Sequence, residues 1–517
     1  MLGTKWLTLF RRCQKGGLHE VRRKALAAVL TQCGCSLAVQ AAASALRRTK
    51  STRMITRGDL GRYIGIALWA LVCGLFMSTR LNAQCHLASF RVDVTIPLGH
   101  RCMGVLPTKS KSIRDRLYAN GFVLLSNEAP IVLCALDWCE VRNGAYDAWR
   151  DALAKAAGTT RERVLVCSLH QHDAPVADRD AAKLLRDVGL GGELYDEAFH
   201  DDAIRRVATA VSLSLQKPMT VTHLGIGQAR VERIASNRRI VMPDGRVTFD
   251  RGSRSGGEAL HRDAPEGDVD PLLKTISFWK DDEPVLALHA YATHPMSSYG
   301  AGEVSSDFVG LAREMRQRDD LSVQQIYVSG CSGDVTAGRY NDGTPESRRA
   351  LTERLHAAMV AAWQQTQKFP LRQVGFRSTQ VELEFHPDPS LAEKELGSVL
   401  TDNTQSVETR ILAAMGLASR QRVRRGQKID FPCIDFGAAK VLLFPAESFV
   451  GYQLMAQAMC PDAVVMSIGY GECWPGYIPT DAAFRDGFQD KWLWVAPGSE
   501  ARMRRAIEDV LCVKEVD

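Results

Sequence analysis

Two histidines separated by one residue give the strongest local signal for chemistry in this sequence. The mostly apolar residues 164–169 run directly into His170-Gln171-His172, and Pro175 ends the pattern. Because residues i and i+2 of a strand point to the same side, we expect His170 and His172 to share a face. Two imidazoles at the carboxyl end of a strand can bind a metal, or one can bind it while the other hydrogen-bonds a substrate. A pair of hydrogen-bonded loop histidines is the alternative that the motif alone leaves open.

A third candidate histidine follows a second apolar run. Residues 285–288 are apolar, and the segment 289–295 continues as HAYATHP. His294 lies where the strand is expected to give way to a loop, whereas His289 lies inside the apolar run and is expected in the core. Residues 330–335, GCSGDV, form a small-residue loop suited to close backbone approach around a ligand, or simply a tight turn. No Gly-x-Ser-x-Gly motif surrounds the serines there, so a nucleophilic serine is not indicated.

A carboxylate and a tyrosine complete the candidate residues. Glu447 ends the apolar segment 442–446, although a helix is expected to follow, and glutamate is favoured at a helix N-terminus in any case. Tyr477 belongs to the segment 476–480, GYIPT, in a loop rich in Trp, Gly and Tyr. Taken alone, that loop indicates only an aromatic surface or packing.

The elements that must position these residues alternate between strands and helices, which predicts an α/β class. No Pro- or Ser-rich linker divides the chain after residue 85, so we expect one large catalytic domain of β-sheets flanked by helices. The polar, Gly- and Arg-rich residues 233–270 predict a long loop or lid. The predicted strands are 121–125, 131–136, 164–169, 272–279, 284–291, 325–328 and 440–444, and the predicted helices are 146–157, 201–216, 308–318, 347–365, 449–459 and 500–511.

The charge distribution separates the N-terminal region from the rest of the chain. The 517 residues carry a net charge of +6, but residues 1–84 hold 14 Lys and Arg against 2 acids, a net of +12, so the remainder has +6 − 12 = −6. A mildly acidic body without a basic stripe argues against a nucleic-acid partner. The 14 cysteines include no CxxC pair, and many lie in apolar runs, where they predict small buried side chains; one or two disulfides remain an alternative.

The N-terminal region resembles an export leader. Residues 54–84 combine a basic start, an apolar run over 63–77 and a small-residue cleavage point after Ala83, which is typical of a secretory signal peptide. An uncleaved membrane anchor formed by residues 63–77 is the alternative. Residues 1–53 are Arg-rich and predict either a leader or an extension of the gene model upstream of Met54. We therefore expect an exported protein whose folded part is 85–517.

Taken together and in this order, the motifs resemble the neutral, non-lysosomal ceramidase family over roughly residues 88–500. HQHDAP is similar to the family's HTHSGP, and THPM, SSDFVG, SGDV, FPAES and GYIPT also match family motifs. The resemblance implies one Zn²⁺ ion held by His170, His294, Glu447 and Tyr477. This mix of nitrogen and oxygen donors suits zinc as a Lewis acid. By the same match, His172 lies beside the metal and Arg238 corresponds to the family's active-site arginine.

The activity implied by the resemblance is zinc-dependent hydrolysis of the amide bond of ceramide, or of a related N-acyl lipid, to a fatty acid and an amine. His172, Tyr477 or Arg238 would stabilise the oxyanion, and His172 would pass a proton to the leaving amine. The implied partner is a small lipid-like amide, with peripheral membrane contact. Two alternatives stay open: a zinc hydrolase of another amide or ester, and a non-catalytic exported binding protein on the same scaffold.

The sequence departs from the family pattern in three places. Gly330, with Ser329 beside it, stands where the family has a serine before GDV, and a family tyrosine is replaced near Phe488. The C-terminal immunoglobulin-like domain of the family is expected to be absent. The metal site is therefore expected to be intact, whereas specificity for ceramide is left open.

Overall fold

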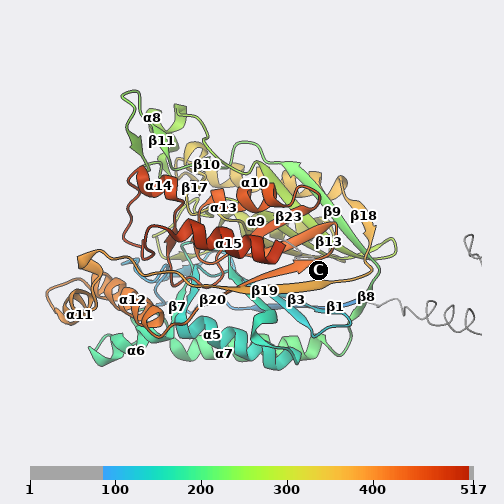
Figure 1. Cartoon of the computed structure of the whole chain (residues 1–517), viewed down its shortest axis with the longest axis horizontal. Coiled ribbons are helices and arrows are strands. Elements are labelled where there is room, and N and C mark those ends of the chain that lie inside the picture. The colour runs from blue at the N-terminus through green and yellow to red at the C-terminus, as the bar shows by residue number, and fades with distance from the viewer. Residues whose placement is uncertain (1–84, 512–517) are drawn as a thin grey trace, which may run out of the picture. The chain divides into compact units, whose positions relative to one another are not determined.

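The structure, a computed structural model, describes residues 85–511, which lie in one compact unit. The predicted leader (1–53), the predicted signal peptide or anchor (54–84) and the last six residues lie outside the described residues. Within the described part, helices and strands alternate along the chain and the strands form several separate sheets, so the predicted α/β class is confirmed. In Figure 1, α5 (Asn143–Ala157) and α7 (Glu197–Ser214) lie along the lower side of the strands, and α15 (Ser499–Leu511) lies in front of them.

The first sheet is mixed and presents two buried faces. Side chains alternate along its strands, so that Phe122 and Leu133 face a second sheet, while Val123 and Val132 face helices α5 (Asn143–Ala157) and α7 (Glu197–Ser214). Both helices lie along the lower side of the unit in Figure 1. The strands of this first sheet run in the order β6 (Val164–Ser168), β4 (Ile131–Leu136), β3 (Tyr118–Leu125), β1 (Cys85–Asp93) and β8 (Met219–Val221).

The second sheet packs face to face on the first, and Phe122 and Phe278 meet edge-on across the interface with ring centroids 5.4 Å apart. Burial of each such aromatic side chain contributes about 1.5–3 kcal/mol. Helices α9 (Asp307–Asp319) and α10 (Pro345–Gln364) cover its other side. Its strands run in the order β16 (Gln324–Ser329), β14 (Glu283–Tyr291), β13 (Leu272–Lys280), β9 (His223–Arg230) and β18 (Gln367–Pro370).

A third sheet and a helical hairpin complete the unit, and only part of them was expected from the sequence. The sheet packs against α13 (Val450–Met459) and α15 (Ser499–Leu511), both expected as helices. The hairpin of α11 (Glu393–Thr401) and α12 (Val407–Arg424) was not predicted; it extends to the left in Figure 1. The sheet runs in the order β19 (Gly375–Val381), β20 (Ile429–Asp435), β21 (Ala439–Leu443) and β23 (Val464–Ile468).

The helix and strand ends follow local chemistry. Gly158 ends α5 in the left-handed conformation (φ 66°), as expected for a C-terminal glycine, and Thr344 caps α10 through the backbone N–H of Ser347.

The 233–270 segment is not one open loop, because it forms short elements that lie at the upper left of Figure 1. These elements are β10 (Ser236–Asn237), β11 (Ile240–Val241), β12 (Val247–Thr248), the 3-10 turn Ser255–Gly257 and α8 (Ala259–Asp263).

The nine cysteines between residues 85 and 511 are all free, and eight of them are buried. The alternative of one or two disulfides is therefore wrong for this part of the chain, and the prediction of buried apolar cysteines is confirmed. Within the same residues, no helix is both long enough and apolar enough to cross a bilayer.

Candidate metal centre

The candidate metal ligands lie just beyond the carboxyl ends of three strands, one from each sheet. His170 follows β6, His294 follows β14 and Glu447 follows β21. Glu447 itself begins the short strand β22 (Glu447–Ser448), which pairs in parallel with β24 (Tyr477–Ile478). In that pair Glu447 lies opposite Tyr477. The packing of three sheets thus brings together His170 and Glu447, which are 447 − 170 = 277 positions apart in sequence.

His170 and His172 face the same space, but for a different reason from the one expected. Strand β6 ends at Ser168, and His170 adopts a left-handed backbone conformation with φ 72°. The two rings meet edge to face with centroids 5.2 Å apart. A turn, and not strand alternation, therefore aims both imidazoles at the centre. Left-handed non-glycine residues cost about 1–3 kcal/mol and concentrate at functional sites.

Three buried side chains converge on one point. His294 Nε2 lies 3.0 Å and His170 Nε2 lies 3.4 Å from the same carboxylate oxygen, Glu447 Oε2. The ligand atoms of these three residues all lie within 4.8 Å of one another. The three side chains are only 0–4% exposed, so bulk water does not solvate the carboxylate.

The outward-facing nitrogens of both imidazoles are already bonded. His294 Nδ1 donates to the Ser332 carbonyl at 2.6 Å, and His170 Nδ1 donates to the Cys139 carbonyl at 3.1 Å. Because a carbonyl only accepts, Nδ1 carries a proton on each ring, so Nε2 is the nitrogen that faces Glu447 and is available to a metal. Backbone carbonyls orient metal-binding histidines in the same way.

The pKa shifts agree with a site built for a cation. Burial, followed by the nearby Arg238, lowers the pKa of His294 to about 4, so this ring is neutral at pH 7. Burial alone would raise the pKa of Glu447, but the positive charge of His170, whose own pKa Glu447 raises in spite of burial, holds it well below its usual value. A neutral His294 Nε2 and an ionised Glu447 oxygen at 3.0 Å are two acceptors facing each other. A shared cation between them relieves this repulsion, so the residues present fit a metal ion.

A second set of potential ligand atoms, on Cys139, His170 and His172, also lies within 4.8 Å. Its geometry is less favourable, since the Cys139 thiol lies 4.0 Å from His170 Nδ1, which is already bonded to the Cys139 carbonyl. Burial, with Glu140 nearby, raises the pKa of the Cys139 thiol well above its usual value, which disfavours the thiolate that metals need. The set of His170, His294 and Glu447 is the better candidate.

His172 is buried and lies beside this set without belonging to it. Neither of its ring nitrogens has a hydrogen-bond partner within residues 85–511, although the side chain is only 6% exposed. Its ring contacts Tyr299 at 4.9 Å and lies 6.2 Å from the His294 ring. Burial, and then His170 and His294, lowers the pKa of His172 well below its usual value, so the ring is neutral at pH 7. An unpaired, neutral imidazole is ready to accept a proton or to bond an incoming ligand.

Tyr477 and Arg238 line the other side of the centre. The Tyr477 ring lies 6.4 Å from that of His294, and the Arg238 guanidinium lies 5.6 Å from the centre of the Tyr477 ring. Arg238 Nε is buried without a partner in the described part of the chain. The position before Tyr477 requires a glycine. Gly476 has a φ of 62°, and a Cβ there would lie 1.8 Å from the Trp492 carbonyl oxygen.

Two residues at the centre were missed by the sequence analysis. Tyr470 stacks on His170 with centroids 4.3 Å apart, and its hydroxyl lies 2.7 Å from Ser332 Oγ. Glu140, in the short strand β5 (Glu140–Arg142), places a carboxylate oxygen 4.0 Å from His170 Nδ1. Tyr470 follows the apolar run 464–468, so its place after a strand was a usable signal, whereas nothing around Glu140 pointed to the site.

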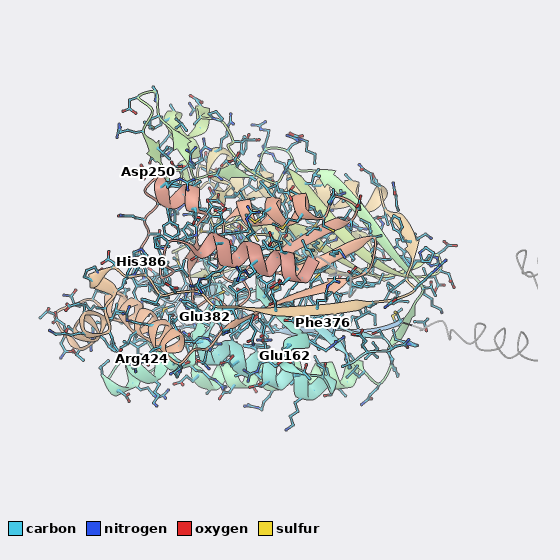
Figure 2. The ribbon with its side chains drawn as sticks, in the orientation of Figure 1. Glu162, Asp250, Phe376, Glu382, His386 and Arg424 are labelled. Atoms are coloured by element: carbon cyan, nitrogen blue, oxygen red, sulfur yellow. The ribbon has the colours of Figure 1, made fainter. Side chains whose placement is uncertain are left out.

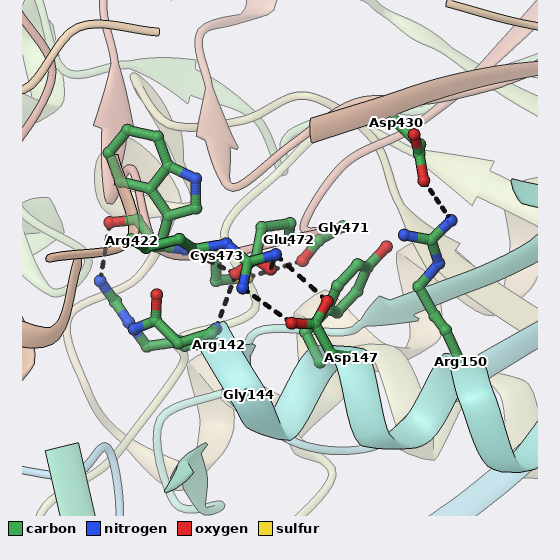
Figure 3. Close-up of polar contacts among 12 residues, drawn as sticks. Arg142, Gly144, Asp147, Arg150, Arg422, Asp430, Gly471, Glu472 and Cys473 are labelled. Atoms are coloured by element: carbon green, nitrogen blue, oxygen red, sulfur yellow. Dashed lines mark hydrogen bonds and ion pairs between the residues drawn. The ribbon is translucent and has the colours of Figure 1, made fainter. Parts of the chain in front are cut away.

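A buried ion-pair network supports the centre from behind. Arg142 pairs with Glu140 at 2.6 Å and donates to the Trp474 carbonyl, and the backbone N–H of Asn143 donates to Glu472. Figure 3 shows Glu472 and Asp147 approached by the guanidinium of an arginine on α12, Arg422. This network ties the loop that carries Tyr470 to helices α5 and α12. The residues that close it are Glu472, Asp147 and Arg422, none of which belongs to a predicted motif.

The departures from the ceramidase pattern have clear structural counterparts. A Cβ on Gly330 would lie 2.6 Å from Gln453 Oε1 and 3.1 Å from the Ala292 Cα, so the surroundings are closed around a glycine. Ser329 does not replace the missing hydroxyl, because its Oγ donates to the Leu169 carbonyl at 2.8 Å. Phe488 does lie at the site, with its ring 5.4 Å from that of Tyr477.

His289 is a core residue, as expected, and its ring is hydrogen-bonded to Thr275 and Gln325.

Comparison with known proteins identifies the fold. No protein-family model matches the sequence, and no curated protein matches it. The crystal structure of neutral ceramidase from Pseudomonas aeruginosa is similar, with a TM-score of 0.61 and 15% identity over 83% of this chain and 74% of that one. A ceramidase structure described as complexed with C2 gives a TM-score of 0.63 and 14% identity over 83% and 75%. The chain therefore has the fold of the neutral ceramidases, as its motifs led us to expect.

Proposed function

We propose that this chain, with its neutral ceramidase fold, is a zinc-dependent hydrolase that cleaves the amide bond of an N-acyl lipid such as ceramide. The observation that carries the proposal is the convergence of His170 Nε2, His294 Nε2 and Glu447 Oε2 within 4.8 Å in a buried site. Both histidines have the tautomer that a metal ligand needs, and the carboxylate is ionised.

Zinc suits this donor set of two imidazoles and one carboxylate, and Tyr477 is the proposed fourth ligand because it lies opposite Glu447 in the β22–β24 pair. Zinc bound there would supply a Lewis acid that polarises a carbonyl and makes water a stronger nucleophile near neutral pH.

His172 is the proposed general base and acid. It is neutral at pH 7 because burial lowers its pKa, and both of its nitrogens are free of protein partners in the described part of the chain. It can therefore take a proton from the attacking water and return it to the leaving amine, which is the group that most needs protonation in amide hydrolysis.

Arg238 and Tyr477 are the proposed oxyanion stabilisers. The unpaired, buried Arg238 Nε adds a fixed positive charge near the centre, and its guanidinium lies over the Tyr477 ring. Donors that are held in place before the reaction stabilise developing negative charge without reorganisation.

The ceramidase fold supports a lipid-like amide as the substrate class, and the local departures from the ceramidase motifs favour a wider range of substrates within that class. Gly330 and Phe488 both remove polar groups that the ceramidase motif pattern would place near the site. We propose a lipid-like N-acyl amide as the substrate, with another amide or ester as the second candidate. A substrate of this kind is consistent with peripheral membrane contact. We also propose export, on the basic start, the apolar residues 63–77 and the cleavage point at Ala83.

The test combines metal content with turnover in the full chain. Wild type should hold about one zinc per chain and hydrolyse a fluorescent ceramide or another member of an N-acyl amide and ester panel. His170→Ala should lose both metal and turnover. His386→Ala, at a partly exposed residue that is labelled in Figure 2, should keep both. Zinc with turnover of other amides alone would move the substrate, and the absence of both zinc and turnover would favour a binding protein.

A further inference from the structure

A separate polar cavity of about 530 Å³ lies outside the metal centre, and none of the candidate ligands lines it. It opens between the 233–270 segment and the N-terminal half of α10, the region where α8 and β10 are labelled in Figure 1. Four arginines and two aspartates are among its lining residues, which gives the lining a formal charge of 4 − 2 = +2. The arginines are Arg233, Arg262, Arg339 and Arg354.

Three of these arginines have no acidic partner. Within residues 85–511, no carboxylate oxygen lies within 4.0 Å of the guanidinium nitrogens of Arg233, Arg339 or Arg354. Only Arg262 is paired, with Asp263 at 3.0 Å. The other lining aspartate, Asp342, is bonded at 2.6 Å to each of two hydroxyls, on Thr344 and Ser347. Asp263, Asp342 and Glu266, which accepts from the Tyr340 hydroxyl at 2.5 Å, offset part of the positive charge, but none of them forms an ion pair with these three arginines.

The three unpaired arginines are also held close to one another. Arg354 Nη1 donates to the Arg233 carbonyl at 2.9 Å, and the guanidinium groups of Arg233 and Arg339 lie 5.9 and 5.4 Å from the centre of the Tyr340 ring. Burial, followed by the charge of Arg233, lowers the pKa of Arg354. Arg233 has a left-handed backbone, with φ 58°. Like charges gathered on a strained backbone are destabilising alone and are relieved when an anion binds between them.

We propose that Arg233, Arg339 and Arg354 form a binding site for a phosphate group. Guanidinium forks match the geometry of phosphate oxygens and bind them through paired, charge-assisted hydrogen bonds. A cavity of about 530 Å³ is larger than inorganic phosphate needs, so the ligand class is a phosphate monoester or diester with an organic substituent. The source is either a soluble phosphate compound or a phospholipid headgroup, and both share this chemistry.

The site is joined to the metal centre through one short strand. The backbone N–H of Arg339 donates to Ser236 Oγ in β10, and β10 pairs with β17 (Val335–Thr336). Arg238, the proposed oxyanion stabiliser, follows β10 directly. The phosphate site therefore borders the segment that carries an active-site residue, although its existence does not depend on the proposed hydrolase activity.

Calorimetric titration of the full chain with inorganic phosphate and with pyrophosphate, at low ionic strength, tests the site. We expect the double variant Arg233→Gln/Arg354→Gln to bind at least about tenfold more weakly than wild type, since each arginine contributes charged hydrogen bonds. Arg339→Gln alone should weaken binding in the same direction. The matched control is Arg230→Gln/Arg246→Gln, which removes two exposed charges outside the cavity and should leave binding unchanged.

Flotation with vesicles distinguishes the two sources of phosphate. Vesicles of phosphatidylglycerol and, separately, of phosphatidylcholine are mixed with wild type and with both double variants. Binding of the free anions that is lost in the cavity variant supports a soluble phosphate compound. Binding to phosphatidylglycerol vesicles alone, lost in the cavity variant but kept in the control, supports a headgroup. The proposal is overturned if wild type binds none of these probes, or if the cavity and control variants bind equally.

Discussion

His294 Nε2 lies 3.0 Å from Glu447 Oε2, while Nδ1 of the same ring donates to the Ser332 carbonyl. The ring therefore directs a lone pair, and not a proton, at an ionised carboxylate. Such a contact is repulsive without a cation, and this single relationship is the strongest argument for a metal in the fold.

Glu447→Gln keeps the size of the side chain and removes its charge, so we expect the full chain to lose bound zinc and with it measurable turnover. Elemental analysis after dialysis measures the metal directly. Glu382→Gln is the control, because Glu382 lies on the surface and forms an exposed ion pair with Lys428. Retention of one zinc per chain in Glu447→Gln would remove Glu447 from the ligand set.

His172→Gln separates a proton-transfer role from a metal-ligand role. Since His172 lies outside the convergent set of ligands, the variant should retain about one zinc per chain, while kcat falls by about 10²–10⁴. Zinc content and steady-state kinetics on the same preparation measure the two quantities. Loss of zinc in this variant would instead make His172 a ligand and would favour the set that contains Cys139.

The ion pair between Asp137 and Arg313 predicts a large effect on stability. Both of its hydrogen bonds are short, 2.6 and 2.7 Å, and both side chains are at most 1% exposed. Arg313→Met leaves Asp137 buried without its partner, so the free energy of unfolding should fall by about 3–5 kcal/mol. Urea denaturation measures it. Arg205→Met breaks only an exposed pair with Asp202 and should change stability by less than about 1 kcal/mol; equal effects would contradict the assignment.

Much of the site could be predicted from the sequence because its parts are local. An apolar run that ends in a histidine or a glutamate identifies a strand and the residue beyond it, and His170, His294 and Glu447 were found in this way. Glu140 was missed because its place at the site depends on the packing of elements far apart in sequence, whereas Tyr470 had a usable signal in its position after the strand 464–468. The left-handed conformation of His170 also has no local sequence signal, so the reason given for the common direction of His170 and His172 was wrong.

For the fold as well, features with a local sequence signal were predicted, and features that depend on long-range packing were not. Strands and helices with strong periodicity were predicted within a few residues of their observed ends, as for β13 and β14 around the turn at Asp281. The α11–α12 hairpin was missed, and it packs through small residues such as Ala413, Ala414 and Ala418, which give a weak apolar pattern. Which sheet each strand joins is a matter of long-range pairing, and nothing local determines it.

Stability should depend on pH through Glu472. Burial raises the pKa of this carboxyl group to about 7, against 4.5 in an unfolded chain, even with Arg422 beside it. The folded state therefore binds the Glu472 proton more tightly than the unfolded state does. The contribution of this proton to the free energy of unfolding is complete below pH 4.5 and is lost as the pH rises through 7. The shift corresponds to a loss on the order of 3 kcal/mol.

Glu472→Gln cannot titrate, so its unfolding free energy relative to wild type should increase between pH 5 and pH 8, by an amount on the order of 3 kcal/mol. Urea denaturation at the two pH values gives the difference. The comparison with wild type cancels other buried acids, such as Asp178, whose pKa is also raised by burial, to about 6. A difference that stays constant with pH would show that Glu472 is ionised throughout.

X-ray absorption spectroscopy of the zinc-loaded full chain tests the central claim most directly, because it identifies the atoms around the metal. We predict only nitrogen and oxygen neighbours at about 2.0–2.2 Å, including the multiple-scattering signature of two imidazoles, from His170, His294, Glu447 and Tyr477. A sulfur neighbour at about 2.3 Å would place the metal on Cys139 instead, and would contradict the proposed centre.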